Sequence, residues 1–547
     1  MNTDTLKTDT GSNPYFAAID LGSNSFHLLV VTINDGVIEK IDRVKEMVQI
    51  ARGLNSTNQL SQAAQDRALH CLRCFQERIR DIPATQIRVA GTKALRSASN
   101  ANHFLKEAEL ALGHTIDIIS GYEEARLVYL GVSHDISADK GRRLVIDIGG
   151  GSTEFVIGEQ KQPKLLESLP IGCVTYSDEF FNDKDSNPPK TITSEMIWKT
   201  YYATCIELEA ICQQYRHLAW DIAVGSSGTM RAVAQLMQDD VVSGVITKDG
   251  LNQLLNQLHT TGSLENTEIF SKERRNTLPA GTVILSAIFD QLGFEQIHVV
   301  DAALKEGLIF DTLSRNPREN NTHDFIDIRD QTVNKMMAQY SVDQEQAART
   351  DQALSHFVKQ LPEPIVNGIN VKSILHWAAQ LHEIGLTISH SGHHHHSYYL
   401  LKESDMAGFS RFEQELLALL VATHRRKISA DKRVLLTGEN QQALHPSLVC
   451  LRLAVLLNQR REDNIELPDI AFTFVKTHHD AAPESEKVSD NHSSSNKSTK
   501  QTDNVTNELH INLRFPDNWL EEHPLTYHNL SQEKARLSPL NVTLQFN

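Results

Sequence analysis

The sequence predicts an α/β protein in which two related α/β domains face each other across a cleft, followed by an all-α domain and a small strand-containing C-terminal domain. Two observations carry this prediction. Phe16–Val31 and Leu144–Ile157 share one pattern: an apolar run, an aspartate, a turn rich in Gly and Ser, and a second apolar run. After about Asn316 the pattern becomes mainly helical. A duplicated strand motif set among alternating helices and strands indicates layered α/β domains.

Each repeated segment has the pattern of a strand, a tight turn and a returning strand. The aspartates Asp20 and Asp147 occupy the same place in the two copies. Periodicity predicts the surrounding elements in chain order. They are a helix Ser61–Ile82, a strand Gln86–Ala90, a helix Ala101–Leu112, a strand Thr115–Ile119, a helix Tyr122–Val132, a helix Ser194–Gln214, a strand Trp220–Val224 and a helix opened by Gly225–Thr229.

We place the two α/β domains at residues 15–135 and 136–315. The all-α domain follows at 320–461, with helical stretches around Gln344–Gln360, Ser373–Leu386 and Phe412–His424. The small C-terminal α/β domain occupies 462–547, with strand-like runs Ile470–Val475, His510–Phe515 and Leu540–Phe546. Thr477–Thr506 is almost free of large apolar residues, so we expect a disordered insertion at 477–506.

Composition narrows the class of protein. The net charge of −16 argues against non-specific nucleic-acid binding. No apolar run reaches the ~18–20 residues of a transmembrane helix, and the first residues lack a signal core. We therefore expect a cytoplasmic protein, and leave open a peripheral association with the inner membrane. Cys71 and Cys74 form a C-x-x-C without a partner pair, which favours a buried helical face over a metal site.

The two turns have the chemistry of phosphate binding. Without bulky side chains, backbone N–H groups can converge on an anion. An aspartate that ends the preceding strand can hold Mg²⁺ directly or through water, and Glu154 can complete a metal site. The turn residues are Ser23, Asn24 and Ser25 in the first copy, and Gly149, Gly150, Gly151 and Ser152 in the second. We assign Asp20 to the phosphate site and Asp147 and Glu154 to the metal.

Several motifs in order resemble the exopolyphosphatase / guanosine pentaphosphate phosphatase family, within the superfamily of actin, sugar kinases and heat-shock ATPases. They are IDLGSNSFHLLV, GTKALR (Gly91–Arg96), IISGYEEARLVYLGV (Ile118–Val132), VIDIGGGSTEFVIG and VGSSGT. The resemblance runs from about Tyr15 to the C-terminus. It implies the actin-like (ribonuclease H-like) fold, Mg²⁺ as the cofactor, and a homodimer whose helical domains contribute to a channel. K⁺ is a candidate stimulating ion.

A glutamate of the E-E-A-R motif is the candidate catalytic base. Ser120 and Glu123 have capping-box spacing, so Glu123 is expected to be occupied at the helix start. Glu124 is then free to face the cleft, with Glu123 as the alternative. The resemblance assigns the family's catalytic glutamate to this motif. It also supports a bidentate grip of Arg96 on phosphate oxygens. The superfamily's nucleotide loop corresponds to Gly225–Thr229, which adds Ser226, Ser227, Gly228 and Thr229 to the predicted phosphate site.

Two features depart from the patterns they resemble. The family segment D-G-A-L-R-E-G appears here as Asp301–Gly307, with Ala302 in place of glycine and Lys305 in place of arginine. Leu375–Leu386 resembles HD-domain hydrolases, but Glu383 stands where their metal-binding aspartate does. We therefore predict an HD-like scaffold that helps to bind a long anionic chain, rather than a second hydrolase. The histidine cluster at 390–396 has no assigned role.

The sequence analysis favours an exopolyphosphatase that releases terminal orthophosphate from inorganic polyphosphate. The alternative is a guanosine pentaphosphate (pppGpp) 5′-phosphohydrolase that produces ppGpp in the stringent response. Gly149–Ser152, His390–Ser397 and His424–Lys427 look more like the exopolyphosphatase branch, whereas Gly172–Thr175 and Gly53–Ser56 look equally like the other. A non-hydrolytic binder and an ATP-using kinase or actin-like ATPase are further classes. Glu124, Asp147 and Glu154 together argue against the binder, and the E-E-A-R helix argues against the kinase.

Overall fold

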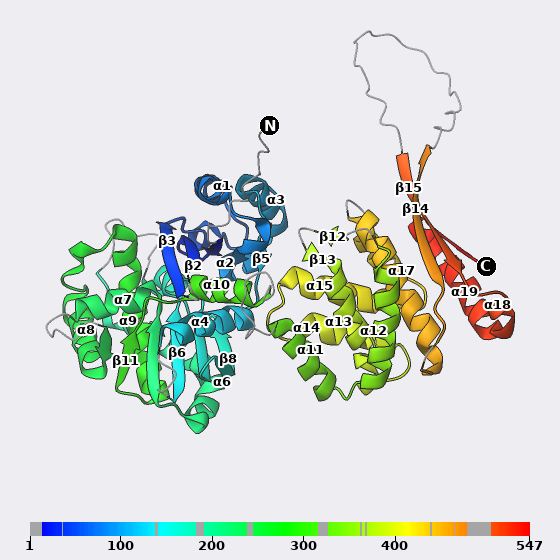
Figure 1. Cartoon of the computed structure of the whole chain (residues 1–547). Coiled ribbons are helices and arrows are strands. Elements are labelled where there is room, and N and C mark those ends of the chain that lie inside the picture. Colours follow the sequence, from blue (N-terminus) through cyan, green and yellow to red (C-terminus); the bar gives the residue numbers. More distant parts are fainter. Residues whose placement is uncertain are drawn as a thin grey trace, which may run out of the picture. The chain divides into compact units, whose positions relative to one another are not determined.

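The computed structural model forms two compact units, each described here by itself. Unit 1 contains the described residues up to Arg329 and the segment Asp405–Phe412, and unit 2 contains Asp330–Ser404 and Glu413–Asn547 (Figure 1). The structure describes residues 14–34, 37–136, 141–181, 191–237, 244–315, 327–361, 364–366, 369–437, 440–463, 465–478 and 505–547.

Unit 1 contains two sheets with the same core topology. The first has the order β3-β2-β1-β4-β5, and the second β10-β11-β9-β6-β7-β8. In the first sheet β3, β2 and β1 pair antiparallel in turn, and β1 pairs in parallel with β4. In the second sheet β8, β7 and β6 pair antiparallel in turn, and β6 pairs in parallel with β9. The strands are β1 (Tyr15–Leu21), β2 (Phe26–Asn34), β3 (Val37–Glu46), β4 (Ile87–Gly91), β5 (Asp117–Ile118), β6 (Arg142–Ile148), β7 (Thr153–Glu159), β8 (Gln162–Leu169), β9 (Ile222–Ser226), β10 (Val245–Thr247) and β11 (Gln296–Val299). The repeated order shows that the unit consists of two related halves.

Helices cover both sheets. They are α1 (Gln62–Ile79), α2 (Lys93–Ser97), α3 (Ala101–Leu112), α4 (Gly121–Asp135), α5 (Cys173–Tyr176), α6 (Ser194–Leu218), α7 (Ser227–Leu236), α8 (Lys248–Thr261), α9 (Lys272–Leu292) and α10 (Leu304–Arg315). Alternation along β1 directs Ala17 and Ile19 to the core formed with α1 and α3. Phe16 and Ala18 face the opposite core, which contains α4, α10 and residues of β6, β7 and β9. Helices α4 and α10 therefore lie between the two sheets (Figure 1).

Unit 2 begins with a helical part. Its helices are α11 (Ile328–Gln339), α12 (Gln344–Val358), α13 (Val371–Leu381), α14 (His393–Glu403), α15 (Arg411–Thr423), α16 (Ala430–Leu436) and α17 (Gln441–Leu457), with the short strands β12 (Ile365–Val366) and β13 (Ile369–Asn370). Most of α17 is buried, and it contacts both α12 and α13. Helix α17 is thus the centre around which this part is built.

The C-terminal part of unit 2 is a three-stranded sheet with a helical crossover. It contains β14 (Asp469–His478), β15 (Val505–Arg514), α18 (Trp519–Glu522), α19 (Pro524–Leu537) and β16 (Val542–Phe546). Strand β15 pairs antiparallel with β14 and in parallel with β16. A parallel pair requires a crossover connection, which α18 and α19 supply.

The predicted fold class is confirmed: two α/β halves of the actin-like type are followed by a helical part and a small part with strands. The four domain boundaries stay predictions. Two details were wrong. The strand expected at Thr115–Ile119 is reduced to β5. The tail was predicted to be α/β without placed helices, and its helices are α18 and α19. The predicted insertion 477–506 begins and ends in strand, because β14 reaches His478 and β15 starts at Val505, and residues 479–504 lie outside the described residues.

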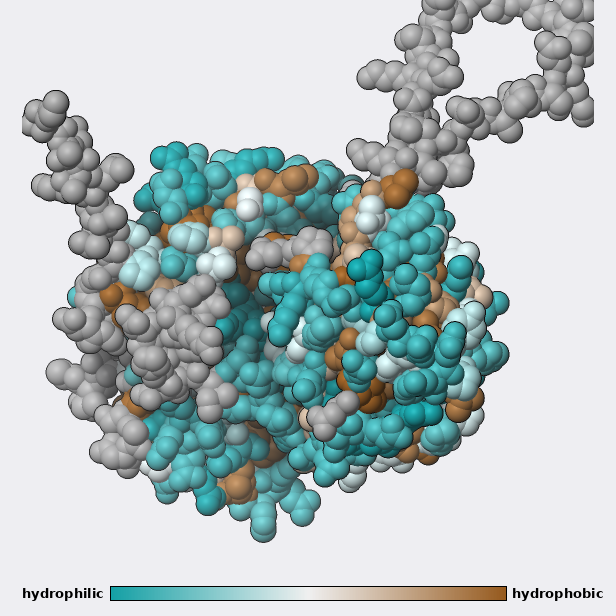
Figure 2. All heavy atoms as spheres, turned by 45° about the vertical axis from the view of Figure 1, so that its right-hand side comes forward, coloured by the Kyte–Doolittle hydropathy of each residue, from teal (hydrophilic) through white to brown (hydrophobic). Residues whose placement is uncertain are grey.

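Two smaller predictions can also be compared with the structure. Cys71 is buried on α1 as expected, but Cys74 is exposed. Within the described ranges, no helix is long and apolar enough to cross a membrane. The face shown in Figure 2 is mainly hydrophilic, with hydrophobic residues in small scattered patches.

Candidate active site

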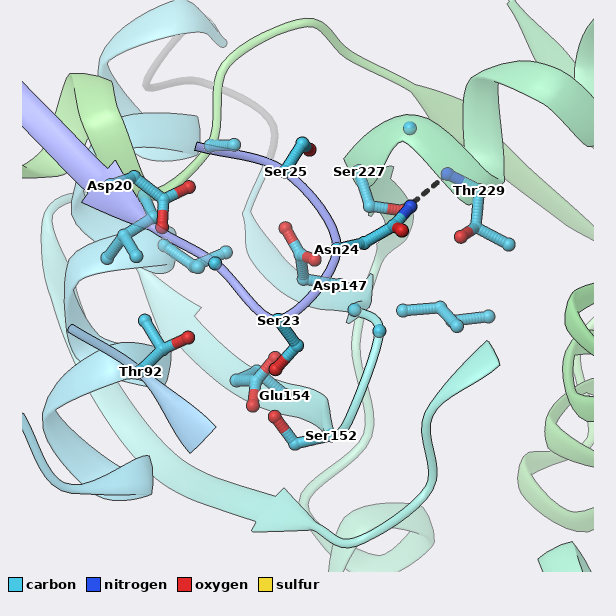
Figure 3. Close-up of a pocket in the computed structure, with 18 of the residues that line it drawn as sticks. Asp20, Ser23, Asn24, Ser25, Thr92, Asp147, Ser152, Glu154, Ser227 and Thr229 are labelled. Atoms are coloured by element: carbon cyan, nitrogen blue, oxygen red, sulfur yellow. Dashed lines mark hydrogen bonds between the residues drawn. The ribbon is translucent and has the colours of Figure 1, made fainter. Parts of the chain in front are cut away.

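A pocket lies where the turns of the two central hairpins meet (Figure 3). Most of the predicted site residues line it: Asp20, Ser23, Asn24, Ser25, Glu124, Asp147, Gly149, Gly150, Gly151, Ser152, Glu154, Ser227, Gly228 and Thr229. Two predicted residues, Arg96 and Ser226, are not among those that line it. Sequence elements from both halves of unit 1 are therefore brought to one place.

The two turns lie against each other. A Cβ atom on Gly150 would lie 3.2 Å from Cβ of Ser23 and 3.4 Å from Cβ of Asn24. The hairpin registers also match, because Asp20 is opposite His27 and Asp147 is opposite Glu154. His27 is thus the counterpart of Glu154 in the first half. The duplication places one carboxylate pair and one carboxylate–imidazole pair around the same pocket.

Four carboxylates line the pocket, and burial raises the pKa of each of them. Burial, followed by the charge of Glu124, raises the pKa of Asp20 to about 8. Burial also raises the pKa of Asp147, and it raises that of Glu154 well above its usual range, with added repulsion from Glu124 and Asp147. Asp20 Oδ1 is buried without a hydrogen-bond partner among the described residues. A cluster of buried carboxylates favours the binding of a cation.

The start of α4 separates the roles of its two glutamates. Ser120 is the N-cap residue, and its Oγ accepts a hydrogen bond from the backbone N–H of Glu123 at 3.1 Å. The Glu123 carboxylate accepts two hydrogen bonds from Arg126, at 2.7 and 2.8 Å, and its side chain is 1% exposed. Glu124 instead lines the pocket. Glu123 is therefore occupied as expected, but by an arginine rather than by a reciprocal cap.

Glu124, the candidate general base, is buried and lies beside Arg96. Burial raises its pKa to about 7, although the charge of Arg96 acts in the opposite direction. Nη1 of Arg96 lies 3.5 Å from Glu124 Oε2 and donates to the carbonyl of Ile119 at 2.6 Å. Arg96 thus contacts the candidate base, and its predicted grip on phosphate stays a prediction.

The N-terminus of α7 forms another wall of the pocket. Ser227 has a φ of 96°, and its Oγ accepts hydrogen bonds from the backbone N–H groups of Thr229 and Met230, both at 3.2 Å (Figure 3). Ser226 is fully buried, and its Oγ donates to the carbonyl of Ala302 at 2.9 Å. A hydrogen bond from Ser226 also lowers the pKa of Asp147. The structure therefore gives Ser226 a contact with a pocket carboxylate rather than with the pocket itself.

Basic residues of the pocket were largely missed by the sequence analysis. The lining includes Arg231, Arg274 and Lys305. Lys305 is 2% exposed, and its Nζ lies 3.0 Å from Glu306 Oε2, so the lysine that replaces the family's arginine is buried. Arg274 stood out in the sequence only as part of a basic pair. Arg231 carried no signal, because it reaches the pocket through the position of α7.

Arg43 and Lys45 lie on β3 and add positive charge near Arg231 and Arg274. The guanidinium of Arg43 donates to Asp301 at 2.7 and 3.3 Å, and Arg231 forms a second ion pair with Asp301. The Lys45 residue is largely exposed. The partial burial of its ammonium, followed by the charges of Arg274 and Arg231, lowers the pKa of Lys45 to about 8. Excess positive charge beside a carboxylate cluster suits a ligand with several anionic groups.

The histidines of unit 2 give no sign of a metal centre. Across the described residues, no group of three or more His, Cys, Asp or Glu side chains is arranged to hold an ion. Both carboxylate oxygens of Glu383 accept from Arg461, at 2.9 Å each. His382 and His424 are buried. The predicted HD-like anion-binding scaffold stays a prediction.

The halves of unit 1 and their pocket define a class of protein: an actin-like α/β fold with paired Gly- and Ser-rich turns, a carboxylate cluster and a candidate general base. The comparisons with known proteins are more specific. Residues 29–316 match the Ppx/GppA phosphatase family, and residues 328–534 match domain III of Ppx/GppA phosphatases. The chain belongs to the Ppx/GppA phosphatase family of hydrolases.

Two similar curated proteins are both named guanosine-5'-triphosphate,3'-diphosphate pyrophosphatase. The one from Aeromonas hydrophila subsp. hydrophila is 40% identical over 457 residues, which cover 82% of this chain and 88% of that protein. The one from Vibrio atlanticus is 35% identical over 543 residues, covering 98% and 99%. Among solved structures, the Aquifex aeolicus PPX-GPPA enzyme is 25% identical with a TM-score of 0.46, covering 55% of this chain and 99% of its own.

Proposed function

We propose that this chain removes the terminal 5′-phosphate of guanosine pentaphosphate, leaving guanosine tetraphosphate and orthophosphate. The relatives carry this choice, because proteins 35–40% identical over most of the chain bear the name of that activity. It is the alternative of the sequence analysis, and it replaces polyphosphate as the first choice. The pocket supports this choice because its lining combines carboxylates with cations, among them Arg231 and Arg274.

In this proposal Glu124 is the general base. Because its pKa is about 7, a large fraction of the carboxylate is ionised at neutral pH, and the ionised group is basic enough to accept a proton. A water molecule attacks the terminal phosphorus, and its proton passes to Glu124. The phosphoanhydride bond to the next phosphate breaks, and that phosphate leaves with the bond's electrons. Backbone N–H groups of the two turns and the cations of the pocket stabilise the charge on the transferred phosphoryl group.

The residues present fit a magnesium ion. Burial raises the pKa values of Asp20, Asp147 and Glu154, which a bound cation would counteract, and Asp20 Oδ1 has no hydrogen-bond partner among the described residues. We propose that Asp147 and Glu154 hold Mg²⁺, with water and phosphate oxygens as its other ligands. When bound, Mg²⁺ supplies charge neutralisation for the phosphate oxygens. K⁺ stays a candidate for stimulation.

Inorganic polyphosphate is the second candidate substrate. The specific observation in its favour is the group of cations in and near the pocket, because Lys45, Arg231 and Arg274 can neutralise any chain of phosphates. A nucleotide and a polyphosphate chain present the same terminal phosphates and differ only farther along the molecule. None of the described residues assigned to the pocket distinguishes the two. The ratio of the two activities therefore has to be measured.

The experiment compares orthophosphate release from guanosine pentaphosphate and from long-chain polyphosphate, in Mg²⁺ with and without K⁺. We expect kcat/KM to favour the nucleotide, and we expect chelation of Mg²⁺ to abolish release. Glu124→Gln keeps the shape of the side chain but removes the base, so kcat should fall by about 10²–10⁴-fold.

Glu107→Gln is the matched control, because Glu107 is an exposed glutamate of α3 outside the pocket. It should leave kcat unchanged. A preference for polyphosphate would reject the proposed substrate and restore the second candidate. Unchanged release by Glu124→Gln would reject the proposed base.

A further inference from the structure

One short segment of the chain joins unit 1 from far along the sequence. Helix α14 ends at Glu403 in unit 2, Asp405–Phe412 belongs to unit 1, and Glu413 is again part of unit 2. The centre of the segment is Gly408, which has a φ of 85°. A Cβ atom there would lie 2.4 Å from Cγ2 of Ile328, so glycine permits both the backbone conformation and the close approach.

Both peptide groups of Gly408 are held by charged side chains. Its backbone N–H donates to Glu123 Oε2 at 2.8 Å, and this bond is buried. Its carbonyl oxygen accepts from Nη2 of Arg315 at 2.5 Å. A backbone N–H and a backbone carbonyl of one residue are therefore fixed by opposite charges, and such charge-assisted hydrogen bonds are stronger than neutral ones.

These contacts close into a ring behind the pocket. Arg126 donates twice to Glu123 and once to Asp311 at 2.5 Å. Arg315 Nε donates to the same Asp311 at 2.8 Å and returns to Gly408. Although burial acts in the opposite direction, the charges of Arg315 and Arg126 hold the pKa of Asp311 well below its usual range. Side chains of α4 and α10 and the backbone of Gly408 thus form one continuous network.

The ring lies beside the candidate base. Glu123 precedes Glu124 on the first turn of α4, and neighbouring helical residues point in directions about 100° apart. Because the Glu123 carboxylate is held by Gly408 and Arg126, the rotation of this turn is fixed, and Glu124 faces the pocket. Loss of the Gly408 contact would remove one of the groups that hold the Glu123 carboxylate.

We propose that Asp405–Phe412 is a positioning clasp, through which Gly408 and Arg315 hold the first turn of α4 so that the Glu124 carboxylate stays at the pocket. The proposal rests on the proposed function only for the role of Glu124. It makes hydrolysis at the turns of unit 1 dependent on a segment whose chain neighbours on both sides belong to unit 2. Glu123, Arg315 and Gly408 act through Glu124 and touch no substrate.

Arg315 and Arg88 provide a matched comparison. Both contact Asp311, since Arg88 Nη1 donates to Oδ2 at 3.0 Å, but Arg315 also donates to the carbonyl of Gly408. Arg315→Met in the full chain should lower kcat about tenfold with KM unchanged. It should also shift the pH at which kcat reaches half its maximum, because Glu124 is repositioned. Arg88→Met should leave kcat within about twofold and the pH profile unchanged.

The conservative variants guard against a variant that fails to fold. Arg315→Lys keeps the charge and should restore kcat to within about threefold of the wild type, and Arg88→Lys is its control. Equal losses of kcat in the Arg315 and Arg88 variants would overturn the clasp, as would an Arg315→Met protein with wild-type kcat and pH profile. If the wild type hydrolyses polyphosphate but not guanosine pentaphosphate, the proposed substrate fails. The same comparison is then made with polyphosphate, and its outcome decides the clasp separately.

Discussion

The charge of Arg96 counteracts the effect of burial on the candidate base. Its guanidinium lies 3.5 Å from Glu124 Oε2 and opposes the rise in pKa that burial imposes on this carboxyl. The wild-type kcat should rise as the pH increases through about 7, because only ionised Glu124 accepts a proton. Arg96→Met removes the opposing charge, so the pKa of Glu124 rises and the ascending limb of the pH–kcat profile moves to higher pH. The expected shift is about one unit.

The measurement is kcat against pH from 5 to 10 at saturating substrate and Mg²⁺. Lys93→Met is the matched control, because the charge of Lys93 also lowers the pKa of Glu124 but contributes less than Arg96. The ascending limb of the pH–kcat profile should therefore shift less in Lys93→Met than in Arg96→Met. An ascending limb at the same pH in the wild type and Arg96→Met would show that Arg96 does not set the ionisation of the base.

Single residues could be located from the sequence where the chemistry is local. Asp20 and Asp147 were found because each lies directly before its own Gly- and Ser-rich turn. His27, Arg231 and Lys45 were not found. His27 and Arg231 reach the pocket through hairpin register and the position of α7, and Lys45 lies on β3, which pairs with β2. Long-range pairing leaves no mark on the residues around such a side chain.

At the level of elements, α4 carries the candidate base, and its N-cap sets where the helix begins. Ser120 Oγ accepts from the N–H of Glu123, and Thr193 Oγ1 makes the same cap on α6, accepting from the N–H of Met196 at 3.3 Å. Loss of an N-cap hydroxyl costs about 1 kcal/mol of unfolding free energy. Ser120→Ala and Thr193→Ala should each show that loss, but only Ser120→Ala should also lower kcat, by about two- to tenfold, because it frees the turn that bears Glu124.

Urea unfolding and kcat measured on the same samples separate the two effects. An equal kcat in both variants would mean that the helix start does not position Glu124. The comparison depends on both caps having the same geometry at the helix start, while Thr193 lies outside the pocket lining.

Elements with strong local patterns were predicted well. The helix expected at Ala101–Leu112 has those bounds in α3, and both duplicated hairpins are present. Helix α19 was missed because its buried positions include Glu533, a charged residue that periodicity counts as polar. Its burial is explained by Arg452, which lies on α17 and is 1% exposed. Such a partner becomes visible only in three dimensions.

At the scale of the whole molecule, two units with separate cores are linked by a chain that crosses from unit 2 to unit 1 and back at Asp405–Phe412. Unit 2 depends on the buried ion pair of Arg452 and Glu533, and Arg452 also donates to the carbonyls of Thr423 and Arg426. Because the pair joins α17 to α19, it connects the helical part of unit 2 to its C-terminal part.

Glu533→Ala should therefore destabilise unit 2 selectively. The change leaves the Arg452 guanidinium buried without its carboxylate, which costs about 3–5 kcal/mol. Scanning calorimetry should show two transitions, of which one falls by roughly 10 °C while the other is unchanged. Glu521→Ala, at an exposed position of α18, is the control and should move neither transition.

Phosphate release should be normal at low temperature and should be lost at the lowered transition, because unfolding of unit 2 frees both ends of the segment that holds Glu123. A single transition that shifts as a whole would show that the two units unfold together.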